Sequence, residues 1–251
     1  MTLLATAAAH LATQAHQLPP TQRADVADVP QCYIDNTWWC GYFWKDYRSE
    51  LQDAFMTHLY IVVVSVALGF VLAMPLALIA RRFKGLESLI VGGTTIIYTI
   101  PSLALFSLLL PVTGLSDTTV IIGLALYSLT ILVRNVLAGL SSVPGEVREA
   151  AVGNGYGPGR LLFTVELPLA LPIIMAGLRV ATVSTVALAT IGTIVASGGL
   201  GQLLSDGFDT DFKAEILAAS LLCVAMAVVL DILLVIVQRF ATPWTRARSA
   251  A

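Results

Sequence analysis

The sequence Glu149-Ala150-Ala151, with Gly155 after a gap of three residues, is suited to docking against another protein. Small alanine side chains let a second backbone approach closely, and the carboxylate of Glu149 is favourable near the start of a helix. A glycine adopts the left-handed conformation that ends many helices without a steric penalty. After nine further residues come Val165 and then Leu167-Pro168, and proline fits the first turn of a new helix. We therefore predict a docking helix over about 147–155 and a long helix that begins at Leu167-Pro168.

Arg179 and Asp231 are charged residues inside long apolar runs. At 1.5 Å per residue, each lies about 10–15 Å from the nearer end of its run. Charges inside a bilayer are unfavourable, so they normally pair with each other or face water. The two residues could form a latch that opens, a static ion pair, or two side chains that each extend to the membrane surface. The sequence leaves these interpretations open.

Hydroxyl side chains accompany Arg179 along the same run. On a helix with about 100° per residue they fall within an arc of roughly 80° around Arg179; they are Thr182, Thr190, Thr193 and Ser197. Such a stripe is suited to lining a path for a polar solute. Hydroxyl residues are also enriched where membrane helices pack closely, so packing is the alternative. The histidines show no ligand spacing, so we predict neither a metal site nor covalent catalysis.

The helices that position these residues can be predicted from the composition of the chain, which is unusually apolar. The 251 residues are 57% hydrophobic and only 12% charged, with a mean hydropathy of +0.83, whereas soluble domains are about 25% charged. A helix needs about 20 apolar residues to cross a bilayer, where all its backbone groups must be paired. We therefore predict an all-α integral membrane protein, with a bend near Pro101. The five predicted spans cover about 59–80, 89–110, 120–140, 169–196 and 216–237.

Basic residues predict the orientation, because lysine and arginine are retained on the cytoplasmic side. One set of alternate segments contains Arg81, Arg82, Lys84, Arg134, Arg148, Arg160, Arg239, Arg246 and Arg248. The other set contains only Arg23, Lys45, Arg48 and Lys213. The N-terminus is therefore expected outside and the C-terminus inside, with the docking helix in a cytoplasmic loop over 141–168.

The full spacing of the docking sequence resembles the cytoplasmic coupling loop of bacterial ABC importer permeases. Thr99-Ile100-Pro101, Arg134-Asn135 and the segments 165–179 and 197–201 are similar to permease subunits of osmoprotectant importers, which carry glycine betaine, choline, carnitine and related quaternary amines. Ser197 stands where that pattern usually has glycine. The similarity covers about 56–240 and implies the permease fold of type I ABC importers.

The resemblance also implies partners. These are cytoplasmic ABC ATPase subunits, an identical or sister permease, an extracytoplasmic substrate-binding protein and membrane lipid, but no nucleic acid. The residues implied in ATPase coupling are Glu149, Ala150, Ala151, Gly155, Leu167 and Pro168. The glycine-rich segment 153–160 lacks both GxGxxG spacing and a GK[ST] ending. We therefore expect a transport subunit without a cofactor of its own, with ATP and Mg on the separate ATPase.

Other functions remain open on the sequence alone. The coupling motif is shared across substrates, so an amino-acid permease, for example for methionine, is the nearest alternative. An ion-coupled secondary transporter or channel is less favoured, because five spans cannot divide into the equal halves common in that class. A membrane scaffold that only binds an ATPase is a third possibility. A quaternary ammonium group is expected to bind an aromatic cage, and all four tryptophans lie outside the predicted spans. High-affinity selection is therefore expected in the binding protein.

Residues 1–55 are predicted to be an outer segment, before the permease domain 56–240 and a cytoplasmic tail 241–251. We expect no cleaved signal peptide and a flexible stretch over 18–36. Trp38, Trp39 and Trp44 are typical of the membrane interface, with a substrate cage as the alternative. Cys32 and Cys40 lie on the oxidising side, where a disulfide is plausible.

Overall fold

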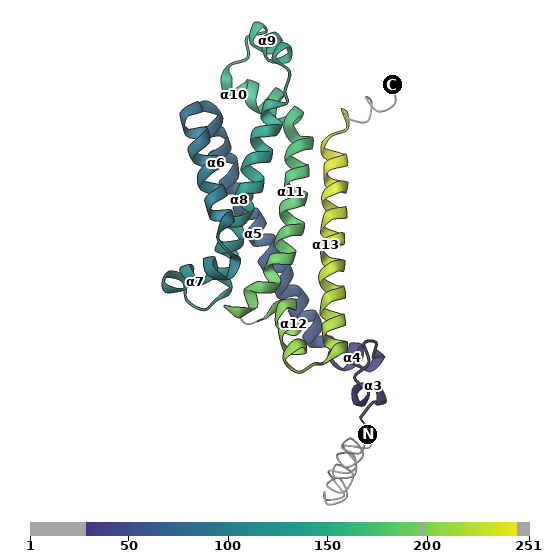
Figure 1. Cartoon of the computed structure of the whole chain (residues 1–251). Coiled ribbons are helices and arrows are strands. Elements are labelled where there is room, and N and C mark those ends of the chain that lie inside the picture. Colours follow the sequence, from purple (N-terminus) through teal and green to yellow (C-terminus); the bar gives the residue numbers. More distant parts are fainter. Residues whose placement is uncertain (1–28, 196–197, 245–251) are drawn as a thin grey trace, which may run out of the picture.

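A computed structural model describes residues 29–195 and 198–244, and every regular element within these ranges is helical (Figure 1). The elements in chain order are α3 (Gln31–Ile34), α4 (Gly41–Asp46), α5 (Arg48–Arg82), α6 (Lys84–Thr99), α7 (Ser102–Thr113), α8 (Asp117–Ser141), α9 (Gly145–Gly153), α10 (Pro158–Leu161), the π-helical turn η1 (Leu162–Glu166), α11 (Leu167–Ala189), the 3-10 turn η2 (Thr190–Ile194), α12 (Gly199–Asp209) and α13 (Lys213–Ala241).

Within the described residues, four helical stretches are long and apolar enough to cross a membrane. They are Arg48–Arg82, Asp117–Ser141, Pro158–Ile194 and Lys213–Ala241. Helices α6 and α7 pass the same test together but are bent by 100° where they meet, so there are up to five spans. The all-helical fold with about five spans is therefore confirmed, and the second span is broken rather than continuous over 89–110.

The break between α6 and α7 lies at Ile100 and Pro101, where the bend was predicted. Proline has no N–H to donate and pushes the preceding residue into an extended conformation, and Ile100 has φ −69° and ψ 128°. The Tyr127 hydroxyl of α8 donates a hydrogen bond to the Ile100 carbonyl. This bond satisfies a backbone acceptor at the helix end, so the break is compatible with an apolar surrounding.

Helix α8 is the centre of the packing. The other elements bury 67% of its most apolar stretch, against 6% for α13. Its contacts are mainly with α5 and α11. At Gly139 the backbones come so close that an added Cβ would lie 2.9 Å from the Ala170 carbonyl oxygen and 3.3 Å from Ala170 Cβ. A small residue at this crossing is therefore required by the packing of α8 on α11.

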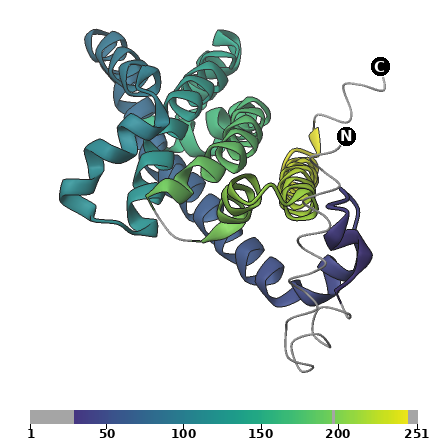
Figure 2. The ribbon, with the colours of Figure 1, turned by 60° about the horizontal axis from the view of Figure 1, so that its bottom comes forward.

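The long helices give the molecule two ends. Helices α9 and α10 and the C-terminal end of α13 lie at one end, and α3, α4, α7 and α12 lie at the other (Figure 1). Figure 2 turns the second end forward and shows α5 running obliquely past α11 and α13. This arrangement agrees with the predicted orientation, in which the docking helix and the C-terminus share the cytoplasmic side.

The ends of two spans can be compared with the sequence prediction. Helix α5 begins at Arg48 rather than near 59, because its first turns are polar and extend beyond the apolar part. The α-helix of the fourth span ends at Ala189 and continues as the 3-10 turn η2 to Ile194. The predicted end at about 196 lies outside the described residues. Gly198 and Gly199, with φ +117° and +73°, then reverse the chain into α12, which was not predicted.

Candidate functional site

The predicted docking helix is α9, which projects beyond the ends of the long helices (Figure 1). It spans Gly145–Gly153 and contains no buried residue. Glu149 and Ala150 are exposed, and so are the apolar side chains of Val147 and Val152, with exposed fractions of 38% and 57%. A surface of small and apolar side chains with nothing packed on it is suited to being held by another protein.

The ends of α9 correct two details of the prediction. The helix begins two residues before 147, after Pro144, so Glu149 lies in its middle and Glu146 is the acidic residue of its first turn. Gly155 has φ +79°, the left-handed conformation predicted for it. The helix itself ends at Gly153, and the Asn154 side-chain amide donates a 2.7 Å hydrogen bond to the Ala150 carbonyl oxygen.

Helix α11 begins at Leu167, as predicted, but it continues a helical stretch that starts earlier. The helical stretch starts at Pro158, directly after Gly157, and passes through η1 before it reaches α11. Pro168 therefore follows a π-helical turn. A wider turn is a reasonable local arrangement there, because proline cannot donate to the normal i→i−4 hydrogen bond.

Glu166, between Val165 and Leu167, is a functional candidate that was not among the predicted site residues. Only 4% of its side chain is exposed, and Arg81 at the end of α5 holds both carboxylate oxygens at 2.7 and 2.5 Å. Arg148 of α9 places Nε 2.8 Å from Oε1, an ion pair whose angles are not those of a hydrogen bond. The same guanidinium donates to the Leu140 carbonyl at the end of α8. One buried carboxylate therefore joins α5, α9 and η1.

Arg179 and Asp231 form the ion pair that their similar depth suggested. Nε of Arg179 lies 2.7 Å from Oδ1, and the terminal nitrogen lies 2.8 Å from Oδ2. This bidentate pair connects α11 to α13, and about a third of each side chain is exposed in the single chain. The geometry is compatible with either a static pair or a latch.

The predicted hydroxyl stripe is divided by the end of α11. Thr182 is buried and donates a 2.8 Å hydrogen bond to the Leu178 carbonyl. Thr190 and Thr193 lie on η2 and donate to the Ala187 and Thr190 carbonyls at 2.7 and 3.2 Å. Ser197 lies outside the described residues. Since the 100° repeat stops at Ala189, the single arc does not extend to the later members.

The exposed face of α11 carries another set of side chains. They are apolar and spaced three or four residues apart, as expected for one side of a helix, and consist of Ala176, Val180, Val183 and Ala187. Sequence periodicity could have identified this stripe, because its small and β-branched residues repeat with the helical period.

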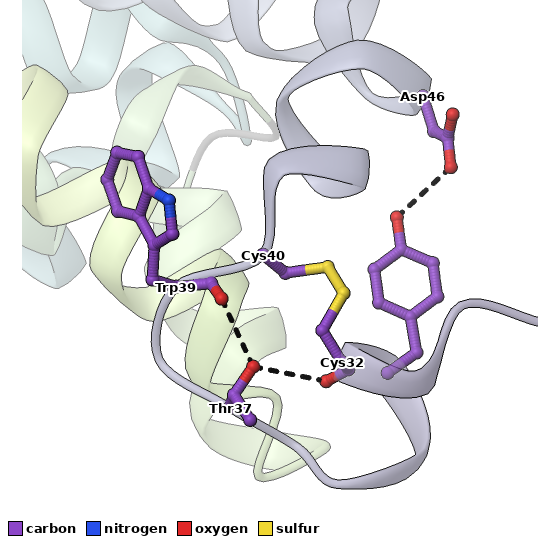
Figure 3. Close-up of a disulfide and its surroundings, with 6 residues drawn as sticks. Cys32, Thr37, Trp39, Cys40 and Asp46 are labelled. Atoms are coloured by element: carbon purple, nitrogen blue, oxygen red, sulfur yellow. Dashed lines mark hydrogen bonds between the residues drawn. A yellow bond between two sulfur atoms is a disulfide. The ribbon is translucent and has the colours of Figure 1, made fainter.

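The outer segment contains the short helices α3 and α4 in its described part, and residues 18–28 of the stretch predicted to be flexible lie outside the described residues. Cys32 and Cys40 are joined by a disulfide, with their Cα atoms 5.6 Å apart (Figure 3). Within the loop that this disulfide closes, the Thr37 hydroxyl donates a 3.1 Å hydrogen bond to the Trp39 carbonyl. Asn36 fixes the loop to the start of α13, where its side-chain oxygen accepts a 3.0 Å hydrogen bond from the Lys213 amide.

Aromatic packing completes this contact. Phe43 is fully buried and meets Phe212 edge to face at 5.4 Å between ring centroids. Trp38 and Trp39 are 55% and 66% exposed, which suits the predicted interface position. Elsewhere, Tyr98 and Tyr127 form an edge-to-face pair with 5.7 Å between ring centroids.

Within residues 29–195 and 198–244, no group of three histidine, cysteine, aspartate or glutamate side chains lies close enough together to hold a metal ion.

Comparisons with known proteins place most of the chain within one group. Residues 54–247 match the family described as "Binding-protein-dependent transport system inner membrane component". The chain is 36% identical over 204 residues to the choline transport system permease protein of Bacillus subtilis, covering 81% of this chain and 90% of that protein. It is 34% identical over 207 residues to an osmoprotectant import permease protein of Salmonella typhimurium, covering 80% and 96%.

A solved structure shows the same fold. The inward-facing MetNI methionine ABC transporter superposes with a TM-score of 0.72 at 21% identity, over 78% of this chain and 98% of the transporter chain.

Proposed function

Since the chain belongs to the family of binding-protein-dependent transport system inner membrane components, we propose that it is the permease subunit of an ATP-driven importer for a quaternary-amine osmoprotectant. The observation that carries the proposal is the coupling motif on α9, which is an exposed helix. This helix lies at the same end of the molecule as the C-terminal end of α13 (Figure 1). The relatives named for choline and osmoprotectant transport support the substrate class.

Coupling to ATP hydrolysis is assigned to α9. A cytoplasmic ATPase would hold the exposed face around Ala150, Ala151 and Val152, with Glu149 at its edge and Gly155 allowing the chain to turn away. ATP and Mg bind to that ATPase, and this chain hydrolyses nothing. Leu167 and Pro168 act further along, where the loop passes into the fourth span.

A second permease, identical or a sister chain, completes the membrane part. The apolar face of α11 and the weakly buried helix α13 support this, since only 6% of the most apolar stretch of α13 is covered by its own chain. Lipid surrounds the remaining surface. The solute path would run between the two permeases, near Thr190 and Thr193, and the pair Arg179–Asp231 would lie beside it.

Substrate selection is assigned mainly to an extracytoplasmic binding protein. Trp38, Trp39, Trp44 and Trp244 lie outside the long apolar helices, and Tyr127 already uses its hydroxyl at the α6–α7 break. The spans therefore hold no group of tryptophans that could enclose a quaternary ammonium group. An amino acid such as methionine is the second candidate, supported by the fold shared with a methionine transporter.

The test is uptake of labelled glycine betaine, choline and carnitine by cells with and without the gene, after redundant carriers are removed. Methionine serves as a fourth substrate, and each uptake is measured at low and raised osmolarity. Loss of one quaternary amine on deletion supports the proposal and names the substrate. If uptake of all three amines is unchanged and methionine uptake is lost, the proposed substrate class is wrong. The assignment as an importer permease then still stands.

A further inference from the structure

The buried carboxylate of Glu166 lies where three elements meet, and we propose that it is the positioning residue that transmits movement of α9 to the membrane helices. The inference rests on the proposed function, in which an ATPase moves α9. It concerns a residue that the coupling motif itself leaves unspecified.

Among the described residues, helix α9 has one charged side chain that connects it to the rest of the chain. It has no buried residue, and among the described residues Arg148 is the one residue of α9 whose own side chain makes a hydrogen bond or ion pair outside the helix. Arg148 also donates to the Leu140 carbonyl. The short segments before and after α9 supply the only covalent connections. A displacement of α9 is therefore conveyed through Arg148 in addition to the backbone.

Glu166 passes this displacement to two membrane helices. Arg81 binds both of its oxygens, which fixes the carboxylate to the end of α5. Glu166 is also the last residue of η1, so its backbone leads directly into α11. Since only 4% of the side chain is exposed, water cannot readily replace either arginine. Breaking one contact would leave a buried charge partly unpaired, so the three groups are expected to move together.

The turn at Glu166 is suited to such movement. Residues Leu162–Glu166 are π-helical, and π-helical turns inside α-helices frequently lie at functional positions. A strongly held carboxylate beside a wide turn lets α11 change its direction while its contact to α9 is kept.

The experiment uses the full chain with its ATPase, in a Cys223→Ser background that leaves only the disulfide-bonded cysteines. A cysteine at Val183, on the face of α11 assigned to the second permease, is labelled with a maleimide before and after addition of ATP and vanadate, so that a change in this contact changes the labelling rate. The ratio of the two labelling rates reports whether nucleotide moves α11, and it needs no transported substrate. Copurification of the ATPase is measured in the same preparations.

Arg148→Met is expected to keep the ATPase bound and to bring the ratio of the two labelling rates close to one, because the movement of α9 no longer reaches α11. Glu166→Gln, which keeps the size of the side chain and leaves α9 unchanged, is expected to have the same effect. Arg148→Lys, which retains a charge, should restore part of the change. Arg82→Met is the matched control at the same helix end and should behave as the parent chain.

A full rate change in both Arg148→Met and Glu166→Gln would overturn the inference, and so would loss of the ATPase in both, because the residues would then serve docking instead. A parent chain that binds no ATPase would overturn the proposed function, which is a separate result.

Discussion

Replacing Gly139 by alanine is expected to weaken the contact between α8 and α11. The added Cβ would lie 2.9 Å from the Ala170 carbonyl oxygen, 3.2 Å from Ile174 Cγ1 and 3.3 Å from Ala170 Cβ. Carbon atoms normally approach at about 3.5–4.0 Å, so the helices must separate by a few tenths of an ångström. Two of the three obstructing atoms are backbone or Cβ atoms, which cannot rotate away.

The magnitude combines two opposing effects. Overpacking a tight site destabilises by about 1–3 kcal/mol, whereas alanine in place of glycine inside a helix is favourable by roughly 0.5–1 kcal/mol. Gly93→Ala on α6 is the matched control, because a Cβ there meets nothing within 4 Å. The free energies of unfolding of Gly139→Ala and Gly93→Ala should therefore differ by about 1–3 kcal/mol, with Gly139→Ala the less stable.

Reversible unfolding in detergent micelles, followed by circular dichroism, measures both variants against the parent chain. If the two substitutions change the free energy of unfolding by the same amount and in the same direction, the close crossing at Gly139 does not exist in solution and the reasoning is refuted.

Three further predictions concern other parts of the molecule. Gly155→Asp should reduce copurification of the ATPase while membrane insertion is unchanged, because an L residue is strained at φ +79°; normal copurification and transport would contradict this. Tryptophan at Thr190 or Thr193 should abolish uptake without loss of assembly, as judged by uptake and gel filtration, and unchanged uptake would remove both from the path. Burial, together with the hydrogen bond that Tyr33 donates to Asp46, raises the pKa of Tyr33 to about 12. Since the folded pKa exceeds the unfolded value, the associated stability is present below pH 10 and is lost as pH rises from about 10 to 12. The difference between phenolate absorbance titrations of the parent chain and Tyr33→Phe should show this late step, and Asp46→Asn should move it to lower pH.

The sequence predicted those features that depend on neighbouring residues or on long apolar runs. The break at Pro101 follows from the chemistry of one residue, and the spans follow from composition. An ion pair of Arg179 with Asp231 was one of the interpretations left open, because each lies at a similar depth, although they are 52 residues apart. The left-handed Gly155 was also predictable, since few other residues end a helix in that conformation.

Features that depend on distant partners were missed. Glu166 was not among the predicted site residues, because Arg81, which binds it, lies 85 residues away and no sequence pattern connects the two. The 3-10 turn at Thr190 and the helix α12 were not predicted, because the apolar pattern continues where the α-helix stops. The start of α9 was misplaced because Pro144 and Gly145 were not considered as a helix start.

The contact between the disulfide-closed segment and α13 has a consequence for how the chain is made. Asn36 and Asp211, which are hydrogen bonded at 2.5 Å, are separated by 175 residues, and the buried cluster around Phe43 includes Ala214 and Ala218. At a synthesis rate of about 5–20 residues per second, the first part is completed roughly 9–35 s before its partner exists. During that interval the aromatic face of the segment is outside the membrane without its covering helix. Biogenesis therefore has an exposed intermediate on the outer side, and insertion of the last span is the step that covers it.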